Sequence, residues 1–105
     1  MIEHFDVLRV DGFDWDEGNL RKNKVKHNVE IEECQEVVFD EPIYFFDEKH
    51  SQKEERFIGY GLTNRKRYLI IVFTIRRNKI RIISARDQNK KERRIYEKNK
   101  KNTKI

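Results

Sequence analysis

The spacing of apolar side chains changes near residue 42 of this 105-residue chain. Before that point they recur every three or four positions, as on one face of a helix. After it they stand in short continuous or alternating runs, as in strands, and the pattern becomes helical again near the end. Strands in a run with helices set apart are typical of an α+β domain. We therefore predict a small antiparallel sheet of three to five strands flanked by helices.

Three helices are predicted, over residues 16–27, 31–39 and 89–99. Asp16 is a good N-cap for the first of them. Asn28 tolerates the left-handed conformation that often follows a helix, so it suits the end of the same helix. The apolar residues of the first two helices are few: Leu20 and Val25 in the first, and Ile31, Cys34, Val37 and Val38, which share one face, in the second.

Strands are predicted in the other apolar segments: residues 43–46, 56–62, 68–75 and 80–85, with two short N-terminal ones at 5–10 and 13–15. The continuous runs at 68–75 and 80–85 are typical of strands buried on both faces. Arg77 and Asn78 form a candidate tight turn between them. Four residues of these strands are assigned to the core: Phe57, Tyr68, Phe73 and Ile83.

The length fits a single domain, which we place at residues 1–97, with 98–105 as a basic, frayed tail. No apolar run approaches the roughly 20 residues that span a bilayer, and the N-terminus lacks the pattern of a signal peptide. The one cysteine, Cys34, excludes an internal disulfide framework and suits a reducing compartment. We therefore expect a cytoplasmic protein without a membrane partner.

Charge is distributed unevenly along the chain, which carries +5 overall. Residues 1–55 hold 7 basic and 16 acidic side chains, a net charge of −9, whereas residues 56–105 hold 17 basic and 3 acidic ones, a net charge of +14. Such a basic half favours a partner rich in phosphate. The alternative is a basic tail and solvated strand faces that the acidic half neutralises after folding.

Several short motifs occur in an order that is more specific than any one of them. They are Phe13-Asp14-Trp15-Asp16-Glu17, Asn23, Lys26-His27-Asn28-Val29, Ile31-Glu32-Glu33, Glu54-Glu55-Arg56-Phe57-Ile58-Gly59, Val72-Phe73-Thr74, Ile80-Arg81-Ile82-Ile83-Ser84-Ala85-Arg86 and Lys91-Glu92-Arg93-Arg94-Ile95-Tyr96. With these motifs, over roughly residues 11–97, the sequence resembles the BrnT toxins of bacterial type II toxin–antitoxin systems. It departs from the family pattern at Asn19, Asn28 and Glu30, where many relatives have Lys, Gly, and Ser or Thr.

The resemblance implies a fold like that of the RelE-type ribonuclease toxins, a small antiparallel sheet flanked by helices. It implies an endoribonuclease that inhibits translation and is neutralised by a BrnA-like ribbon-helix-helix antitoxin. Promoter DNA would then be bound only through the antitoxin. The alternative function is a module that binds nucleic acid or an acidic partner without chemistry. Growth arrest when the chain is expressed alone discriminates between the two.

Three residues are candidates for catalysis. RNA cleavage needs a group that takes the 2′-hydroxyl proton, a charge that stabilises the phosphorane and a group that protonates the leaving oxygen. A histidine can act as an acid or a base near neutral pH, which makes His27 a candidate, and Lys26 adds a cation beside it. The alternative role of His27 is to stabilise the end of the first helix through the helix dipole.

Arg86 is the third catalytic candidate, because a guanidinium at a strand end can hold phosphate in a bidentate grip. The alternative is an ion pair with one of the many acidic residues of the first part of the chain, residues 1–55. Strict alternation along the strand places Ser84 on the same face as Arg86 and Arg81 on the other face.

Four further residues are candidates for RNA binding: Arg65, Arg67, Arg93 and Trp15. The two arginines of the predicted 65–67 loop are equally compatible with a solvated basic turn. The tryptophan can stack on a base or anchor the core. Glu92, which shares a helix face with Tyr96, is a further candidate base, and its alternative is a solvated helix position.

No compact group of histidines, cysteines or carboxylates has the spacing of metal ligands. Cationic side chains can stabilise a phosphorane without a metal. We therefore expect an enzyme that uses neither a metal nor another cofactor.

Overall fold

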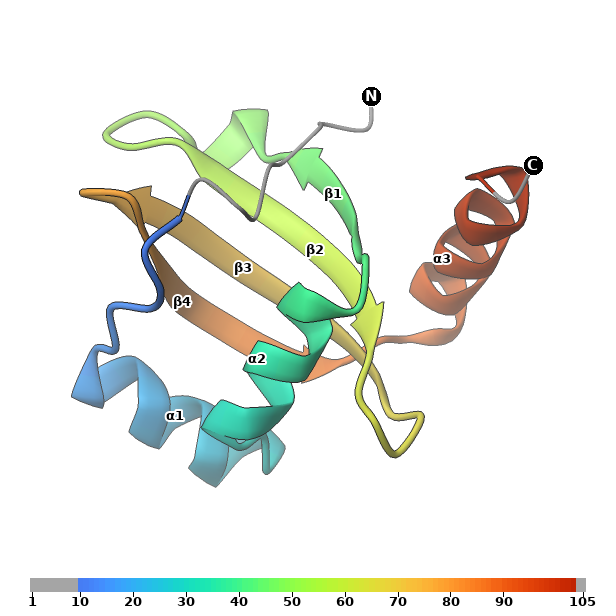
Figure 1. The fold of residues 1–105 in the computed structure, drawn as a ribbon, viewed down its shortest axis with the longest axis horizontal. Helices are drawn as coiled ribbons and strands as arrows, with labels where there is room; N and C mark the ends of the chain where they lie inside the picture. The colour runs from blue at the N-terminus through green and yellow to red at the C-terminus, as the bar shows by residue number, and fades with distance from the viewer. Residues whose placement is uncertain (1–9, 104–105) are drawn as a thin grey trace.

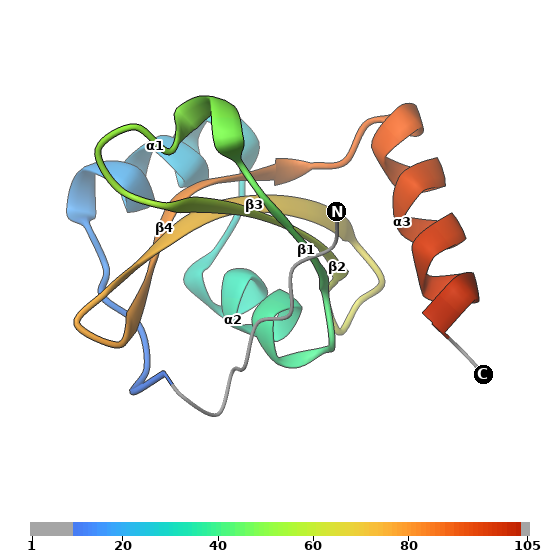
Figure 2. The ribbon, with the colours of Figure 1, turned by 90° about the horizontal axis from the view of Figure 1, so that it is seen from above.

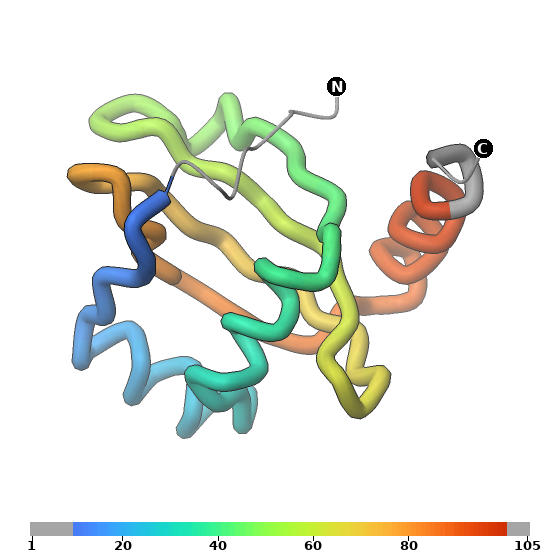
Figure 3. Tube along the Cα trace, in the orientation of Figure 1, coloured from blue at the N-terminus to red at the C-terminus, as the bar shows by residue number. Residues whose placement is uncertain are grey.

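The computed structural model describes residues 10–103. In this part of the chain the elements follow one another as α1 (Glu17–His27), α2 (Ile31–Phe39), β1 (Ile43–Phe46), the short 3-10 helix η2 (Glu48–His50), β2 (Arg56–Leu62), β3 (Tyr68–Arg76), β4 (Lys79–Asp87) and α3 (Lys90–Thr103) (Figure 1). The strands form an antiparallel meander in the order β1-β2-β3-β4, whose path Figure 3 traces. The prediction of an α+β domain with three to five antiparallel strands is confirmed.

The three α-helices take different positions around this sheet (Figures 1 and 2). α2 lies across one face of the sheet and packs on β2, and α1 runs beside the edge strand β4. α3 lies on the side of the sheet away from α1 and contacts β1 and β2. We name the face under α2 the core face and the other the second face. Because side chains alternate along a strand, β3 places Leu69, Ile71 and Phe73 on the core face and Ile70 and Val72 on the second face.

α1 begins and ends where the sequence predicts. Asp16 is the N-cap, and its Oδ1 accepts a hydrogen bond from the backbone N–H of Asn19 at 2.9 Å. Asn28 follows the helix in the left-handed region, with φ 53°, which an asparagine adopts more readily than most residues. The apolar residues predicted for α1 contribute little, since Val25 is 78% exposed.

The edge of β4 is covered by hydrogen bonds with Asp14, which precedes α1, and with Asn23 of α1. The backbone N–H of Asp14 donates to the carbonyl of Ile80 at 2.9 Å, and Asn23 of α1 accepts from the N–H of Ala85 at 3.2 Å. Asn23 is itself 3% exposed. Buried backbone groups need such partners, so α1 docks through a polar residue rather than an apolar stripe.

The core lies between α2 and the core face of the sheet. Cys34, Val37 and Val38 of α2 are buried against the core face, as predicted, and Phe73 is fully buried beneath them. Gly61 allows the close approach of the helix, because a Cβ there would stand 2.7 Å from Cγ1 of Val37. Phe57 is partly buried, and its ring stacks on Phe73 with centroids 5.5 Å apart.

A β-bulge in β4 overturns two predictions. Ile82 pairs with Phe73 and Ser84 pairs with Val72, which leaves Ile83 as an extra residue between them. Ile83 is half-buried and lies outside the core, contrary to its assignment. Because the bulge resets the alternation, Arg81 faces the same side of the sheet as Ser84 and Arg86, not the opposite side.

Other differences from the predicted elements are local. Tyr68 is half-buried under α3, where its ring meets that of Tyr96 edge-on at 5.9 Å, and does not belong to the core. Within the predicted strand 13–15, Phe13 alone forms a bridge, to Ile80. The strand predicted at 5–10 lies, except for Val10, outside the described residues. α3 continues to Thr103, so residues 98–103 are helical where a frayed tail was expected.

Candidate functional site

Three of the candidate residues, His27, Arg67 and Arg86, meet at the C-terminal end of β4. Two ion pairs meet there: Arg86 with Glu92 of α3, and Asp87 with Arg67 from the β2–β3 loop. His27, at the end of α1, joins the second pair through its backbone carbonyl. We name these five residues the strand-end network.

Arg86 is held in a bidentate ion pair on the second face. Its Nη1 donates to Glu92 Oε1 and its Nη2 to Glu92 Oε2, both at 2.8 Å. Glu92 is fixed in turn by the start of α3, since it accepts from the backbone N–H of Asn89 at 2.8 Å while Asn89 Oδ1 accepts from the N–H of Glu92. This reciprocal arrangement is a capping box. Glu92 is therefore a paired helix-cap residue and not the solvated position that was its alternative.

The same ion pair sets the charge state of both partners. The hydrogen bond from Arg86 is the main cause that lowers the pKa of Glu92 below its usual range. The pKa of Arg86 is raised, chiefly by its hydrogen bond to Glu92. A carboxylate with a lowered pKa is a weak base near neutrality, so Glu92 is better suited to orient Arg86 than to accept a proton.

The geometry leaves one edge of the Arg86 guanidinium available. Nη1 uses its two N–H groups on Glu92 and on the backbone carbonyl of Asp87, at 3.0 Å, and Nη2 uses one of its two on Glu92. Within residues 10–103 no hydrogen bond is formed by the Nε–H of Arg86 or by the other Nη2–H. These two groups form a second planar fork of the kind that binds phosphate oxygens. The Arg86 side chain is 40% exposed.

Tyr60, which sequence reasoning did not single out, lies in the same row of the sheet as Arg86. Tyr60 pairs with Ile70 and Ile70 pairs with Arg86, so all three face the second side. Burial, followed by the charge of Glu92, raises the pKa of the Tyr60 hydroxyl. Side-chain alternation places Tyr60 on the face of Arg86 only when the pairing of β2, β3 and β4 is known. The sequence alone therefore contains no signal for it.

Arg67 forms the densest set of contacts in the network. Nε donates to Asp87 Oδ1 at 2.7 Å, and Nη1 and Nη2 donate to the backbone carbonyls of Asn28 and His27, both at 2.8 Å. Nη1 also contacts both carboxylate oxygens of Glu33 at 3.2 Å. The hydrogen bond from Arg67 lowers the pKa of Asp87, and the charge of His27 contributes in the same direction.

The other candidates lie around this end of the sheet or away from it. Lys26, Arg65 and Arg93 are exposed, and the guanidinium of Arg93 stands 4.0 Å from the ring centroid of Tyr68. Trp15 stacks on Phe13 with centroids 5.1 Å apart and packs against the core. The structure thus brings His27, Arg67 and Arg86 to one strand end and leaves Trp15 outside that group.

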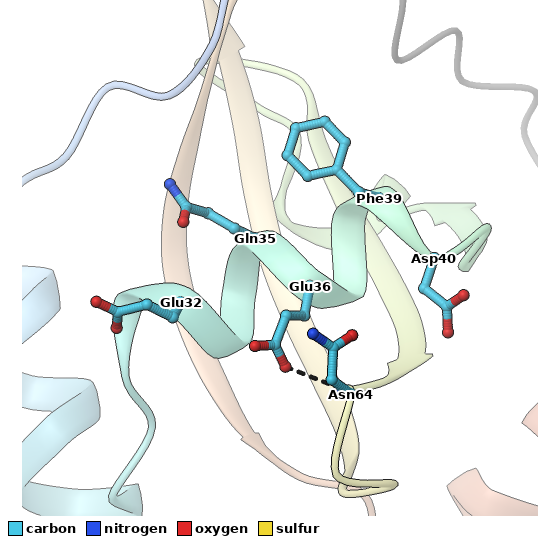
Figure 4. A pocket seen from close by; sticks show the side chains of 6 residues that line it. All are labelled: Glu32, Gln35, Glu36, Phe39, Asp40 and Asn64. Atoms are coloured by element: carbon cyan, nitrogen blue, oxygen red, sulfur yellow. Dashed lines mark hydrogen bonds between the residues drawn. The ribbon is translucent and has the colours of Figure 1, made fainter.

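A hollow beside α2 has the wrong charge for a phosphate. It has a volume of about 470 Å³ and is lined by Glu32, Gln35, Glu36, Phe39, Asp40 and Asn64 (Figure 4). Glu36 accepts a hydrogen bond there from the backbone N–H of Asn64 at 2.9 Å. Three carboxylates and no cation line this hollow, so it repels RNA.

The described residues contain neither a candidate metal site nor a candidate membrane span. No group of three or more histidines, cysteines, aspartates and glutamates in residues 10–103 is arranged to hold a metal ion. No helix in that part of the chain has the length and apolar character needed to cross a membrane.

Comparison with known proteins identifies the family. A sequence model described as "Ribonuclease toxin, BrnT, of type II toxin-antitoxin system" matches residues 15–92. The fold is similar to the crystal structure of the ribonuclease toxin BrnT of Brucella abortus, with a TM-score of 0.59 and 18% sequence identity over 75% of this chain and 97% of that one. A comparison with curated proteins found no match. Because the family model covers most of its length, this chain belongs to the BrnT family of ribonuclease toxins of type II toxin–antitoxin systems.

Proposed function

We propose that the chain is a metal-independent endoribonuclease that inhibits translation, with its catalytic residues at the C-terminal end of β4. The observation that carries this proposal is the free Nε–Nη2 edge of Arg86, held in a fixed orientation by Glu92. An arginine that a carboxylate already orients loses little conformational entropy when it binds a second anion.

The reaction we propose is an internal transfer. The 2′-oxygen of the RNA attacks the adjacent phosphorus, the bond from phosphorus to the 5′-oxygen breaks, and the proton of the 2′-hydroxyl ends, by way of the enzyme, on the 5′-oxygen that leaves. The products are a 2′,3′-cyclic phosphate and a 5′-hydroxyl. Arg86 stabilises the extra negative charge of the phosphorane, which is greatest in the transition state.

His27 is the proposed acid–base residue, assisted by the positive charge of Lys26. His27 is half-buried at the end of α1. After the hydrogen bond from Arg67, the charge of His27 helps to lower the pKa of Asp87, the residue after Arg86. Histidine exchanges protons near neutrality, whereas the lowered pKa of Glu92 makes that carboxylate a poor acceptor.

The exposed arginines extend this surface toward the RNA backbone. Arg65 and Arg93 lie on the loop before β3 and on α3, and we propose that they bind phosphates on either side of the cleavage point. The packed ring of Trp15 gives no support to base stacking. The guanidinium of Arg67, by contrast, is engaged within the protein.

The proposed partner is a ribbon-helix-helix antitoxin of the BrnA type, and promoter DNA is proposed to be bound only through that antitoxin. Membership of a type II toxin–antitoxin family supports an antitoxin partner. The net charge of +14 in residues 56–105 supports an acidic or mixed-charge contact surface on it.

The experiment is a cleavage assay with the purified chain, a mixed-sequence RNA and excess EDTA. We expect cleavage that survives EDTA and leaves 2′,3′-cyclic phosphate ends, and no cleavage of the same sequence made with 2′-deoxyribose. Loss of cleavage in EDTA would contradict metal independence. Binding of RNA without cleavage would identify the chain as a binding module instead.

A further inference from the structure

Arg67 differs from its neighbours in the same loop by the number of its internal partners. Its side chain is 25% exposed, and its five N–H groups point at the carbonyls of His27 and Asn28 and at the carboxylates of Glu33 and Asp87. Arg65 is exposed and forms no such bond within the described part of the chain. A guanidinium has five donors in total, so Arg67 has none left for a phosphate.

The partners of Arg67 come from three distant parts of the sequence. They are separated from it by 39 and 40 residues at the α1–α2 turn, by 34 residues in α2 and by 20 residues in β4. One side chain therefore joins the end of α1, the start of α2 and the end of the edge strand. Without it, two carboxylates and two carbonyls would face one another with no cation between them.

Arg67 contacts the α1–α2 turn at two consecutive backbone carbonyls. Asn28 is in the left-handed region with φ 53° and ψ 43°, and its carbonyl accepts one of the short bonds from Arg67. The carbonyl of His27 accepts the other. The His27 backbone is thus tied to Asp87 through one guanidinium, because Nη2 of Arg67 also donates to Asp87 Oδ2 at 3.3 Å and Nε donates to Asp87 Oδ1 at 2.7 Å.

We propose that Arg67 is a positioning residue, not an RNA-binding one, and that it fixes His27 and Asp87 relative to each other at the end of β4. This inference rests on the proposed function, because the proposed function makes His27 the acid–base residue. A displacement of about 1 Å at a reacting group can cost up to ~10²-fold in rate. A residue that only positions His27 therefore affects cleavage without contacting RNA.

The first arm of the test measures RNA binding as a function of salt. The probe is a single-stranded 2′-O-methyl RNA, which cannot be cleaved by the proposed reaction. Each phosphate contact to a single strand contributes roughly 0.7 to the slope of log affinity against log salt. We expect Arg67→Gln to keep the slope of the parent chain and the matched variant Arg65→Gln to lose about one contact. A slope reduced by Arg67→Gln would overturn the proposal.

The second arm is a double-mutant cycle on the single-turnover cleavage rate at saturating RNA. We expect Arg67→Gln to slow the parent chain about 10- to 100-fold and to have no further effect in a His27→Ala background. A merely structural role would slow both backgrounds equally, and that result would overturn the proposal. All rates are taken below the melting temperature of each variant.

A third variant covers the case in which Arg67→Gln does not fold. Arg67→Lys keeps the charge but loses the planar fork. We expect Arg67→Lys to slow cleavage about 10- to 100-fold, as expected for Arg67→Gln. A rate equal to that of the parent would overturn the proposal. If the parent chain itself does not cleave RNA, the proposed function has failed, and the salt slope alone decides whether Arg67 contacts the nucleic acid.

Discussion

Arg86 and Asp87 are consecutive residues of β4, yet their side chains lie on opposite faces of the sheet and enter different ion pairs. Arg86 stands opposite Ile70 and pairs with Glu92 at 2.8 Å, whereas Asp87 stands opposite Leu69 and pairs with Arg67 at 2.7 Å. One strand end thus anchors α3 on one side and the α1–α2 turn on the other. The guanidinium of Arg86, which is proposed to bind phosphate, and the contacts of Arg67 with the His27 backbone are therefore both held by the C-terminal end of β4.

The ion pair of Arg86 with Glu92 makes stability depend on pH. The pKa of Glu92 is lowered in the folded state, chiefly by its hydrogen bond with Arg86, so its contribution is present above the unfolded value of about 4.3. It is lost as the pH falls through the lower folded value. We expect urea unfolding to show a smaller loss of stability between pH 7 and pH 3 for Glu92→Gln than for the parent chain.

At pH 7 the same variant should be less stable by roughly 1 kcal/mol, a modest value because the pair is partly exposed to solvent. An identical pH dependence in the two proteins would show that the Glu92 carboxylate is not stabilised by folding.

The role proposed for His27 can be separated from that of a helix cap. If His27 transfers protons, His27→Ala should slow cleavage by ~10²–10⁴-fold and flatten the pH–rate profile near neutrality. If it only stabilises the end of α1, the rate should stay and the stability should fall by ~0.3–1 kcal/mol. The matched control is His50→Ala, since His50 is 58% exposed and pairs with Asp47 away from the strand end. The measurement is single-turnover cleavage from pH 5 to pH 9.

Local signals in the sequence were sufficient for most of the fold. Asp16 and Asn28 mark the ends of α1 because capping depends on one or two residues and their own backbone. The apolar spacing of α2 and the continuous runs of β3 and β4 predict their elements for the same reason. These patterns are set by the residues themselves.

Features that depend on distant pairing were not predictable in this way. The bulge at Ile83 arises from the register between β3 and β4, and it moves Arg81 to the face of Arg86. Arg67 has the sequence pattern of a solvated loop arginine, yet its partners lie 20 to 40 residues away. The candidate site was therefore predicted only in its residue types, while the contacts that join them required the structure.

The core under α2 gives a direct test of the packing. Val37 is fully buried, whereas Val25 on α1 is 78% exposed. We expect Val37→Ala to lower the free energy of unfolding by about 2–3 kcal/mol, because it removes two buried methyl groups and leaves a cavity. The same substitution at Val25 should be close to neutral, since alanine favours a helix. Equal effects of the two variants in urea unfolding would contradict the observed packing of α2.

The proposed antitoxin complex should depend on salt. Residues 56–105 carry a net charge of +14, and raising the salt from 0.1 M to 1 M shortens the Debye length from about 10 Å to about 3 Å. We expect the dissociation constant for the product of the adjacent gene to rise with salt, as measured by calorimetry. A thermal melt of the toxin alone in 1 M salt controls for unfolding. An affinity that does not change with salt would contradict a contact dominated by the basic half.

The most direct test of the central claim is the single-turnover rate of RNA cleavage by Arg86→Ala and Arg86→Lys. Arg76→Ala is the matched control, because Arg76 forms an ion pair with Glu54 and is 47% exposed at the other end of β3. Removing one donor that acts mainly on the transition state typically costs ~10²–10³-fold in rate. We expect that loss in Arg86→Ala, a comparable loss in Arg86→Lys, which keeps the charge without the fork, and a rate unchanged from the parent in Arg76→Ala. An Arg86→Ala protein that melts like the parent and cleaves RNA at the parental rate would remove Arg86 from the site and contradict the proposed mechanism.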